Sequence, residues 1–229
     1  MDLALLEKAV RQYAELQVAS TSRVALGRPW PFYDWRMAVL AKEVEHVARE
    51  ARELLAGSPY ELTEVEGERL SGSLPYWVDL CNRTAETEIP DALDHGDLRP
   101  GNIRVVGERL VFYDWAWSAI AHPFISVACL LHILRHAALR AEGTREMLRD
   151  AYLTAWTAYA PLDRLRQIFE LADRARILHG VVSDATWLRC LNAALAGRPL
   201  SPTSADAVTV RWRQYYYARM VRRLFEPGN

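Results

Sequence analysis

The chain has 229 residues, of which 51% are hydrophobic and 25% are charged, with a formal net charge of -1 and a sequence pI near 6.6. These values are typical of a globular protein and exclude wholesale disorder. The near-zero charge gives no overall positive field that would attract nucleic acid. No apolar stretch approaches the roughly 18 residues that span a bilayer. The length allows one large domain or two small ones.

The cysteines and the N-terminal residues indicate the compartment. Cys81, Cys129 and Cys190 lie far apart and lack the CxxC spacing of zinc or redox sites. An odd number of dispersed cysteines is typical of reduced thiols rather than disulfides. The N-terminal stretch carries charges within its apolar run and lacks a signal-peptide core. We therefore expect a cytoplasmic protein without a membrane partner.

The first part of the chain has the apolar periodicity of helices. Asp2 is expected to cap a first helix, which ends before Pro29. A second helix is predicted over 34–55 and a third, less regular one over 62–86.

The residue pattern then changes to short strands. Residues 103–106 and 110–113 are rich in β-branched and aromatic residues, and Gly107 lies in the turn between them. A hairpin here brings Asn102, which precedes the first strand, to the same edge as Asp114, which follows the second. From Phe124 onward helices are predicted over 124–141, 143–159, 162–180, 182–196 and 204–225, with Gly180 marking a break. The expected fold is therefore mainly α with a small β-hairpin, an α+β class.

The chemistry is concentrated between residues 95 and 114. His-Gly-Asp-Leu-Arg-Pro-Gly-Asn occupies 95–102, and Asp114 begins the Asp-Trp pair after the second strand. Asn102 and Asp114 offer side-chain oxygens that suit Mg²⁺, and Asp97 can orient a substrate hydroxyl. Phosphoryl transfer from a nucleotide requires this combination of metal ligands and a positioned carboxylate.

The segment HGDLRPGNIRVVGERLVFYDW resembles the catalytic segment of the aminoglycoside phosphotransferase family, small-molecule kinases related to protein kinases. The similarity extends to residues 121–124 and, more weakly, to the helix around 11–17. It rests on the following matches: His95, Gly96, Asp97, Asn102, Asp114 and Trp115. The resemblance implies a helical C-lobe of the protein-kinase-like fold over 1–229 as a single domain. Within it, 1–88 is a helical lead-in, 89–115 the catalytic loop and hairpin, and 116–229 a helical substrate-side subdomain.

The resemblance also implies the site residues and ligands. Asp97, His95 and Arg99 belong to the catalytic loop, while Asn102 and Asp114 bind the metal and the nucleotide. The cofactors are Mg²⁺ and ATP or another nucleoside triphosphate, and the acceptor is a small molecule with a hydroxyl group.

The N-lobe of such an enzyme is not recognisable in the sequence. Residues before His95 read as helices without a glycine-rich loop, and the lysines of the chain, Lys8 and Lys42, lie on helical polar faces. We therefore expect an isolated chain to be incomplete. A separate N-lobe chain or a homodimer partner would then complete the cleft.

Two residues of this segment leave alternatives open, and Ser126, which follows it, raises a further question. For His95, bracing the loop by hydrogen bonds is favoured over titration during catalysis. Arg99 can grip the γ-phosphate with its guanidinium or form a salt bridge at the loop surface. Ser126 stands near the place where the family usually has an Asp that ties down the loop, so the rigidity of this loop is in question.

Other patterns have ordinary structural explanations. His132 and His136 have an i, i+4 spacing that can bind a metal, yet helix packing is favoured because their flanks are leucine-rich. The basic and aromatic C-terminal segment suits a nucleic-acid surface or an amphipathic helix, and the helix is favoured. Its predicted buried face contains Trp212, Tyr216, Met220 and Leu224.

Three functional hypotheses result. The first is the catalytic lobe of a small-molecule phosphotransferase, and the second is a non-catalytic kinase-like module that binds a small molecule or a protein. The third and least favoured is a nucleic-acid-binding protein. Asp173, Asp184 and Asp206 occupy the helical region where related enzymes place acidic groups for cationic acceptors, and the sequence selects none of them.

Overall fold

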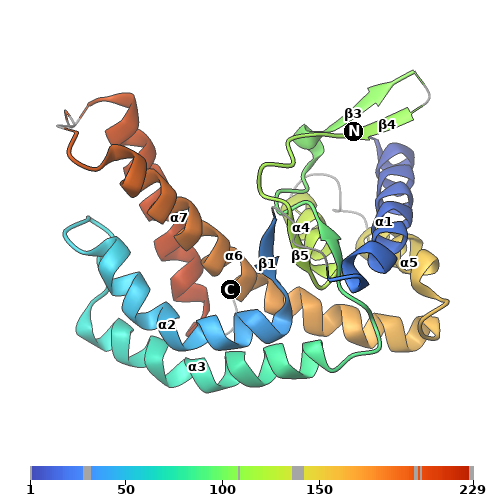
Figure 1. Cartoon of the computed structure of the whole chain (residues 1–229), viewed down its shortest axis with the longest axis horizontal. Helices are drawn as coiled ribbons and strands as arrows, with labels where there is room; N and C mark the ends of the chain where they lie inside the picture. The colour runs from blue at the N-terminus through green and yellow to red at the C-terminus, as the bar shows by residue number, and fades with distance from the viewer. Residues whose placement is uncertain are drawn as a thin grey trace. The chain divides into compact units, whose positions relative to one another are not determined.

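A computed structural model describes residues 2–27, 32–107, 109–135, 142–198, 201 and 203–226. This part of the chain is mainly helical with two small sheets, which confirms the predicted α+β class. It divides into two compact units (Figure 1). Unit 1 contains Met1–Met37 and Arg83–Arg176, and unit 2 contains Ala38–Asn82 and Ile177–Asn229. None of the helices in the described ranges is both long and apolar enough to cross a membrane.

The helices of unit 1 surround an aromatic core. They are α1 (Leu3–Ala25), α4 (Phe124–Leu134), α5 (Thr144–Leu153) and the first part of α6 (Leu162–Leu195). Asp2 caps α1 as predicted, because its carboxylate accepts a hydrogen bond of 2.8 Å from the N–H of Leu5. Aromatic rings from α4, α5, the short 3₁₀ turn Thr154–Trp156 and α6 pack together in the interior: Phe124, Tyr152, Trp156 and Phe169.

A three-stranded sheet of unit 1 was not foreseen. Its strands are β1 (Tyr33–Trp35), β5 (Ala119–Ala121) and β2 (Ala92–Asp94), with β5 in the centre, parallel to β1 and antiparallel to β2. The prediction of a helix from residue 34 was therefore wrong in its start, since α2 begins at Met37. Pairing with the buried strand β5 overrides the helical pattern at these residues.

The predicted hairpin is confirmed. Its strands are β3 (Ile103–Val106) and β4 (Arg109–Phe112), preceded by a 3₁₀ turn at Pro100–Asn102. The hairpin stands beside α1 (Figure 1), where the rings of Tyr13 and Phe112 have centroids 5.4 Å apart. Residues 95–102 thus lie between β2, which ends at Asp94, and the hairpin that packs against α1.

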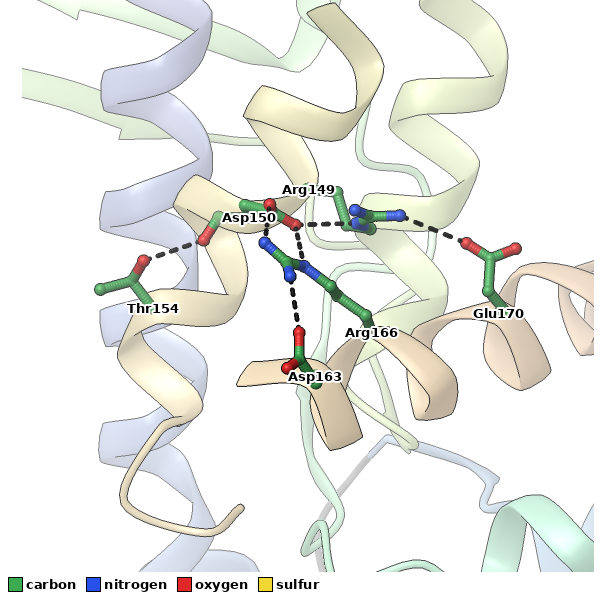
Figure 2. Close-up of polar contacts among 6 residues, drawn as sticks. All are labelled: Arg149, Asp150, Thr154, Asp163, Arg166 and Glu170. Atoms are coloured by element: carbon green, nitrogen blue, oxygen red, sulfur yellow. Dashed lines mark hydrogen bonds and ion pairs between the residues drawn. The ribbon is translucent and has the colours of Figure 1, made fainter. Parts of the chain in front are cut away.

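Ion pairs join α5 to the start of α6 (Figure 2). Asp150 on α5 accepts hydrogen bonds from Arg166 (2.6 Å) and Arg149 (2.9 Å). Arg166 also reaches Asp163 at 2.7 Å, and Arg149 reaches Glu170 at 3.5 Å. The pKa of Asp150 is lowered from its usual value, mainly by its hydrogen bond with Arg166. Burial opposes this effect and Arg149 adds to it.

Unit 2 consists of helices. They are α2 (Met37–Leu55), most of α3 (Glu64–Ala85), the second part of α6 and α7 (Ala205–Arg223). The predicted break at Gly180 is wrong, because α6 continues through it. A Cβ at Gly180 would lie 2.8 Å from the terminal methyl of Met220, so glycine here permits close packing of α6 on α7 rather than ending a helix.

The predicted buried face of α7 is wrong at Trp212 and Tyr216, which are 51% and 41% exposed. It is right at Leu224, which is buried together with Tyr217 and Val221. The carbonyl of Leu224 accepts a hydrogen bond of 2.9 Å from the indole N–H of Trp77, which helps to orient this part of the chain. The side chain of Arg213 packs on an aromatic ring, because its guanidinium lies 4.1 Å from the ring centroid of Trp187.

Candidate active site

The backbone of the segment requires glycine at one position. Gly96 has φ +74°, a conformation that other residues rarely adopt, and an added Cβ would collide with the carbonyl oxygen of Trp117. The chain leaves β2 at Asp94 and turns sharply here. Gly96 therefore sets the direction in which Asp97 leaves the sheet.

His95 holds the loop through both ring nitrogens. Its Nδ1 accepts a hydrogen bond of 3.3 Å from the N–H of Asp97, and its Nε2 lies 2.9 Å from the carbonyl oxygen of Tyr113. A carbonyl can only accept, so Nε2 is the donor in this contact and Nδ1 is the acceptor in the other. The ring is fully buried and lies against Trp115, with centroids 4.5 Å apart. His95 therefore joins the loop to the end of β4, in agreement with the favoured bracing role.

Asp97, Arg99 and Asn102 lie together. The Asn102 amide nitrogen donates to the main-chain oxygen of Asp97 at 2.9 Å and to its Oδ2 at 3.0 Å. Arg99 Nε lies 3.1 Å from the same Oδ2, with 53% of the Arg99 side chain exposed. In this structure Arg99 forms the surface salt bridge that was one of its two interpretations. Within the described residues no partner is assigned to Asp97 Oδ1, which leaves that oxygen for a ligand.

Asn102 and Asp114 lie at the same end of the hairpin. The N–H of Tyr113 donates to the Asn102 carbonyl at 3.1 Å, which extends the β3–β4 ladder by one step and brings Asp114 to the next position. Asp114 has φ +66° and is the single non-glycine residue with positive φ in the described ranges. Such a backbone costs about 1–2 kcal/mol, and strained residues of this kind cluster at functional sites.

The oxygen donors present fit a hard cation. The Asn102 amide nitrogen is used by Asp97, so its Oδ1 is the atom that remains as an acceptor, and the Asp114 carboxylate is exposed. No cluster of three or more His, Cys, Asp or Glu side chains suited to a metal occurs in the described part of the chain. A site with one carboxylate and one amide suits Mg²⁺ bound mainly through phosphate and water, rather than zinc.

A buried hydrogen-bond network around Asp94 supports the start of residues 95–102, and the sequence did not predict it. Tyr13 of α1 accepts a hydrogen bond of 3.0 Å from the N–H of His95 and donates one of 3.2 Å to Asp94 Oδ1. The hydroxyl of Ser126 also donates to Asp94 Oδ1. Burial, together with the charge of Asp94, raises the pKa of Tyr13 well above its usual value, so the phenol stays protonated.

Ser126, which stands near the position of the family's Asp, belongs to this network. A carboxylate does lie beneath the loop, but Asp94 supplies it and Ser126 binds it. Asp94 is fully buried, and its Oδ2 has no hydrogen-bond partner among the described residues. A signal for it was available, since a charged residue directly precedes the segment in an otherwise apolar strand. Tyr13 gave none, because its ring fits the apolar periodicity of α1.

The remaining sequence candidates are elsewhere. His132 Nδ1 lies 2.7 Å from Arg176 Nη2, while His136 is outside the described residues, so the pair is not seen together. Each of the three acidic residues considered for a cationic acceptor lies beside an arginine. The pairs are Asp173 with Arg176 (2.9 Å), Asp206 with Arg198 (3.0 Å) and Asp184 with Arg213 (3.7 Å).

Comparison of the chain with protein-family models and with curated proteins gave no match. Inference about function therefore depends on the residues and their geometry.

Proposed function

We propose that unit 1 is the base- and metal-bearing side of a phosphotransferase that moves a phosphoryl group from a nucleoside triphosphate to a hydroxyl of a small molecule. The proposed architecture is the C-lobe that the sequence resembles. One observation carries the proposal. The Asn102 amide bridges the backbone and carboxylate of Asp97 at the end of the hairpin that leads to Asp114.

The residues divide the reaction between them. Asp97 Oδ1 accepts the hydrogen bond of the acceptor hydroxyl and receives its proton as the oxygen attacks phosphorus. The new O–P bond forms while the bond to the leaving oxygen breaks, and a nucleoside diphosphate departs. Asn102 and His95 fix the position of Asp97 during this step, and Arg99 offsets its charge. A magnesium ion held by Asn102 and Asp114 would neutralise phosphate charge.

A small-molecule binding module without catalysis is the second candidate. An apolar cavity of about 380 Å³ lies in unit 1, a size within the range of ligand pockets. It lies between α1 and the strands, and its lining includes Leu16, Val24, Leu93, Trp115 and Ile120. The Arg99–Asp97 ion pair also favours this candidate, because it occupies one oxygen of the proposed base.

Calorimetry with ATP and Mg²⁺ tests the first candidate. Wild-type chain is expected to bind ATP only when Mg²⁺ is present, and Asp114→Asn is expected to abolish this Mg²⁺-dependent binding. Asp163→Asn is the matched control, since this carboxylate is 87% exposed and lies on α6. Transfer of labelled γ-phosphate to a panel of alcohols, with and without a supplied N-lobe, completes the test. Absence of both binding and transfer in every combination would contradict the proposal.

A further inference from the structure

The apolar cavity in unit 1 lies beside the candidate active site but is separate from it. We refer to it as the α1 cavity, because α1 contributes most of its described lining. Trp115 also lines it, and the ring of Trp115 lies against that of His95, with centroids 4.5 Å apart. The proposed base and metal ligands are not among the described lining residues. A ligand in the α1 cavity is therefore not the hydroxyl acceptor, and the two sites can be tested independently.

The polar groups of the uncharged lining residues already have partners. The hydroxyl of Ser20 donates to the carbonyl of Gln17 at 2.7 Å and accepts a hydrogen bond of 2.9 Å from the N–H of Leu93. The indole N–H of Trp115 donates to the carbonyl of Phe112 at 2.9 Å. The other uncharged lining residues described are aliphatic. These side chains therefore offer a ligand apolar contact rather than hydrogen bonds.

Arg23 is the charged residue of the described lining. It is exposed in the last turn of α1, and no ion pair joins it to an acidic side chain in the described part of the chain. The acidic residue that precedes it on α1, Glu15, lies about two turns earlier. Asp34 lines a neighbouring smaller cavity, but Arg36 donates to both of its oxygens, at 2.8 and 2.6 Å. The guanidinium of Arg23 can therefore meet a negative group of a ligand.

The size of the α1 cavity suits a single apolar chain. Its volume of about 380 Å³ is near the lower end of the range of about 300–1,000 Å³ for ligand pockets. A ligand with one aliphatic chain of moderate length fits this range better than a lipid with two long chains. Each methylene buried against such a lining raises affinity by about fourfold.

We propose that the α1 cavity binds a free amphipathic carboxylic acid, with its apolar chain against Trp115 and the aliphatic lining and its carboxylate on Arg23. A guanidinium matches a carboxylate because its planar fork donates two parallel hydrogen bonds. This inference gives a ligand class to the second candidate function. It rests on the cavity and on Arg23, and does not depend on phosphoryl transfer.

Calorimetric titration of the full chain with hexanoate, octanoate and decanoate tests the apolar part of the site. Affinity should rise by up to about fourfold for each methylene that enters the cavity. Ala19 lines the cavity at an exposed position of α1, so Ala19→Phe can fill the space without disturbing the core. This variant should weaken octanoate binding by about tenfold or more, because two or more methylenes are displaced. Ser22→Phe is the matched control, since Ser22 is exposed on the same helix and is not among the described lining residues.

Comparison of octanoate with 1-octanol tests the charged part of the site. Arg23→Gln should weaken octanoate binding by about two- to fivefold, as expected for an exposed ion pair, and leave octanol binding unchanged. Arg174→Gln is the matched control, because Arg174 is an exposed arginine of unit 1 that is not among the described lining residues. Binding is measured rather than stability, since the charge of Arg23 also suits the C-terminal end of a helix. Circular dichroism of each variant verifies that it is folded.

Absence of saturable octanoate and decanoate binding to the wild type would overturn the proposal, as would binding that Ala19→Phe leaves unchanged. Equal binding of octanoate and octanol would assign the cavity to a neutral ligand and overturn the carboxylate. Sedimentation velocity with and without octanoate tests another occupant. A dimer that octanoate dissociates would assign the cavity to a second copy of the chain and overturn the proposal, whereas an unchanged sedimentation coefficient supports it. Absence of ATP binding alongside intact octanoate binding would contradict only the proposed phosphotransferase function.

Discussion

Replacing Tyr13 with Phe tests whether the buried network holds the candidate site in place. The substitution removes one hydroxyl and leaves the ring contact with Phe112 intact. The hydroxyl donates to the Asp94 carboxylate and accepts from the N–H of His95. A hydrogen bond to a charged group contributes about 1.5–3 kcal/mol and a neutral one about 1 kcal/mol. Both partners are buried and would lose a partner, so the free energy of unfolding should fall by about 2–4 kcal/mol.

Urea denaturation at pH 7, followed by tryptophan fluorescence, measures the effect. A loss of this size corresponds to a fall in Tm of roughly 5–15 °C for a chain of this length. Tyr76→Phe is the matched control, because Tyr76 is 49% exposed and its hydroxyl can remain hydrated in the unfolded and folded states alike. A double-mutant cycle with Ser126→Ala should give a coupling energy of at least about 0.5 kcal/mol, since both hydroxyls bind the same oxygen. A Tyr13→Phe loss no larger than that of Tyr76→Phe would refute the reasoning.

Three further substitutions follow from the same structure. Desolvation lowers the pKa of buried His122 to about 3. Below pH 6.5 the unfolded state therefore binds more protons than the folded state, and the free energy of unfolding falls. His122→Gln should remove about 1.4 kcal/mol of the difference in unfolding free energy between pH 7.5 and pH 5.5. Asp150→Asn should cost about 1 kcal/mol at pH 7, discounted because Arg166 is 38% exposed. Since the pKa of Asp150 is lowered in the folded state, this cost should disappear in urea titrations as the pH falls through that value. Gly96→Ala should destabilise the chain by more than about 1 kcal/mol and remove ATP–Mg²⁺ binding in calorimetry, because a Cβ there collides with the Trp117 carbonyl; unchanged binding would contradict the role given to this turn.

The features that depend on residues close together in the sequence were predicted correctly. The cap at Asp2, the hairpin and the approach of Asn102 to Asp114 all follow from neighbouring residues and strand pairing, and the structure has them. The start of α2 was wrong because pairing of Tyr33–Trp35 with β5 is a contact between residues distant in sequence. Periodicity alone does not contain such a contact.

Glycine and aromatic residues account for the other errors. Gly180 was predicted to break a helix, yet its role depends on Met220, which approaches from a different helix. The aromatic residues of α7 were assigned inward because large apolar side chains are usually buried, but Trp212 lies outward. The support of the candidate site was missed for a related reason. The partners of Asp94 come from positions 13 and 126, and a pattern search along the chain does not bring them together.

Because β3 and β4 pair in a fixed register, insertions at the hairpin tip and deletions within its strands have different effects on the candidate site. Residues inserted at its tip, between Val106 and Arg109, leave the pairing of Ile103 with Phe112 untouched. A residue deleted within either strand shifts Asp114 by about 3.4 Å along the ladder and turns its side chain to the opposite face. The tip can therefore vary in length and composition during evolution, or accept an engineered tag, while the spacing of Asn102 and Asp114 is preserved. Natural variation in this hairpin should be confined to its tip.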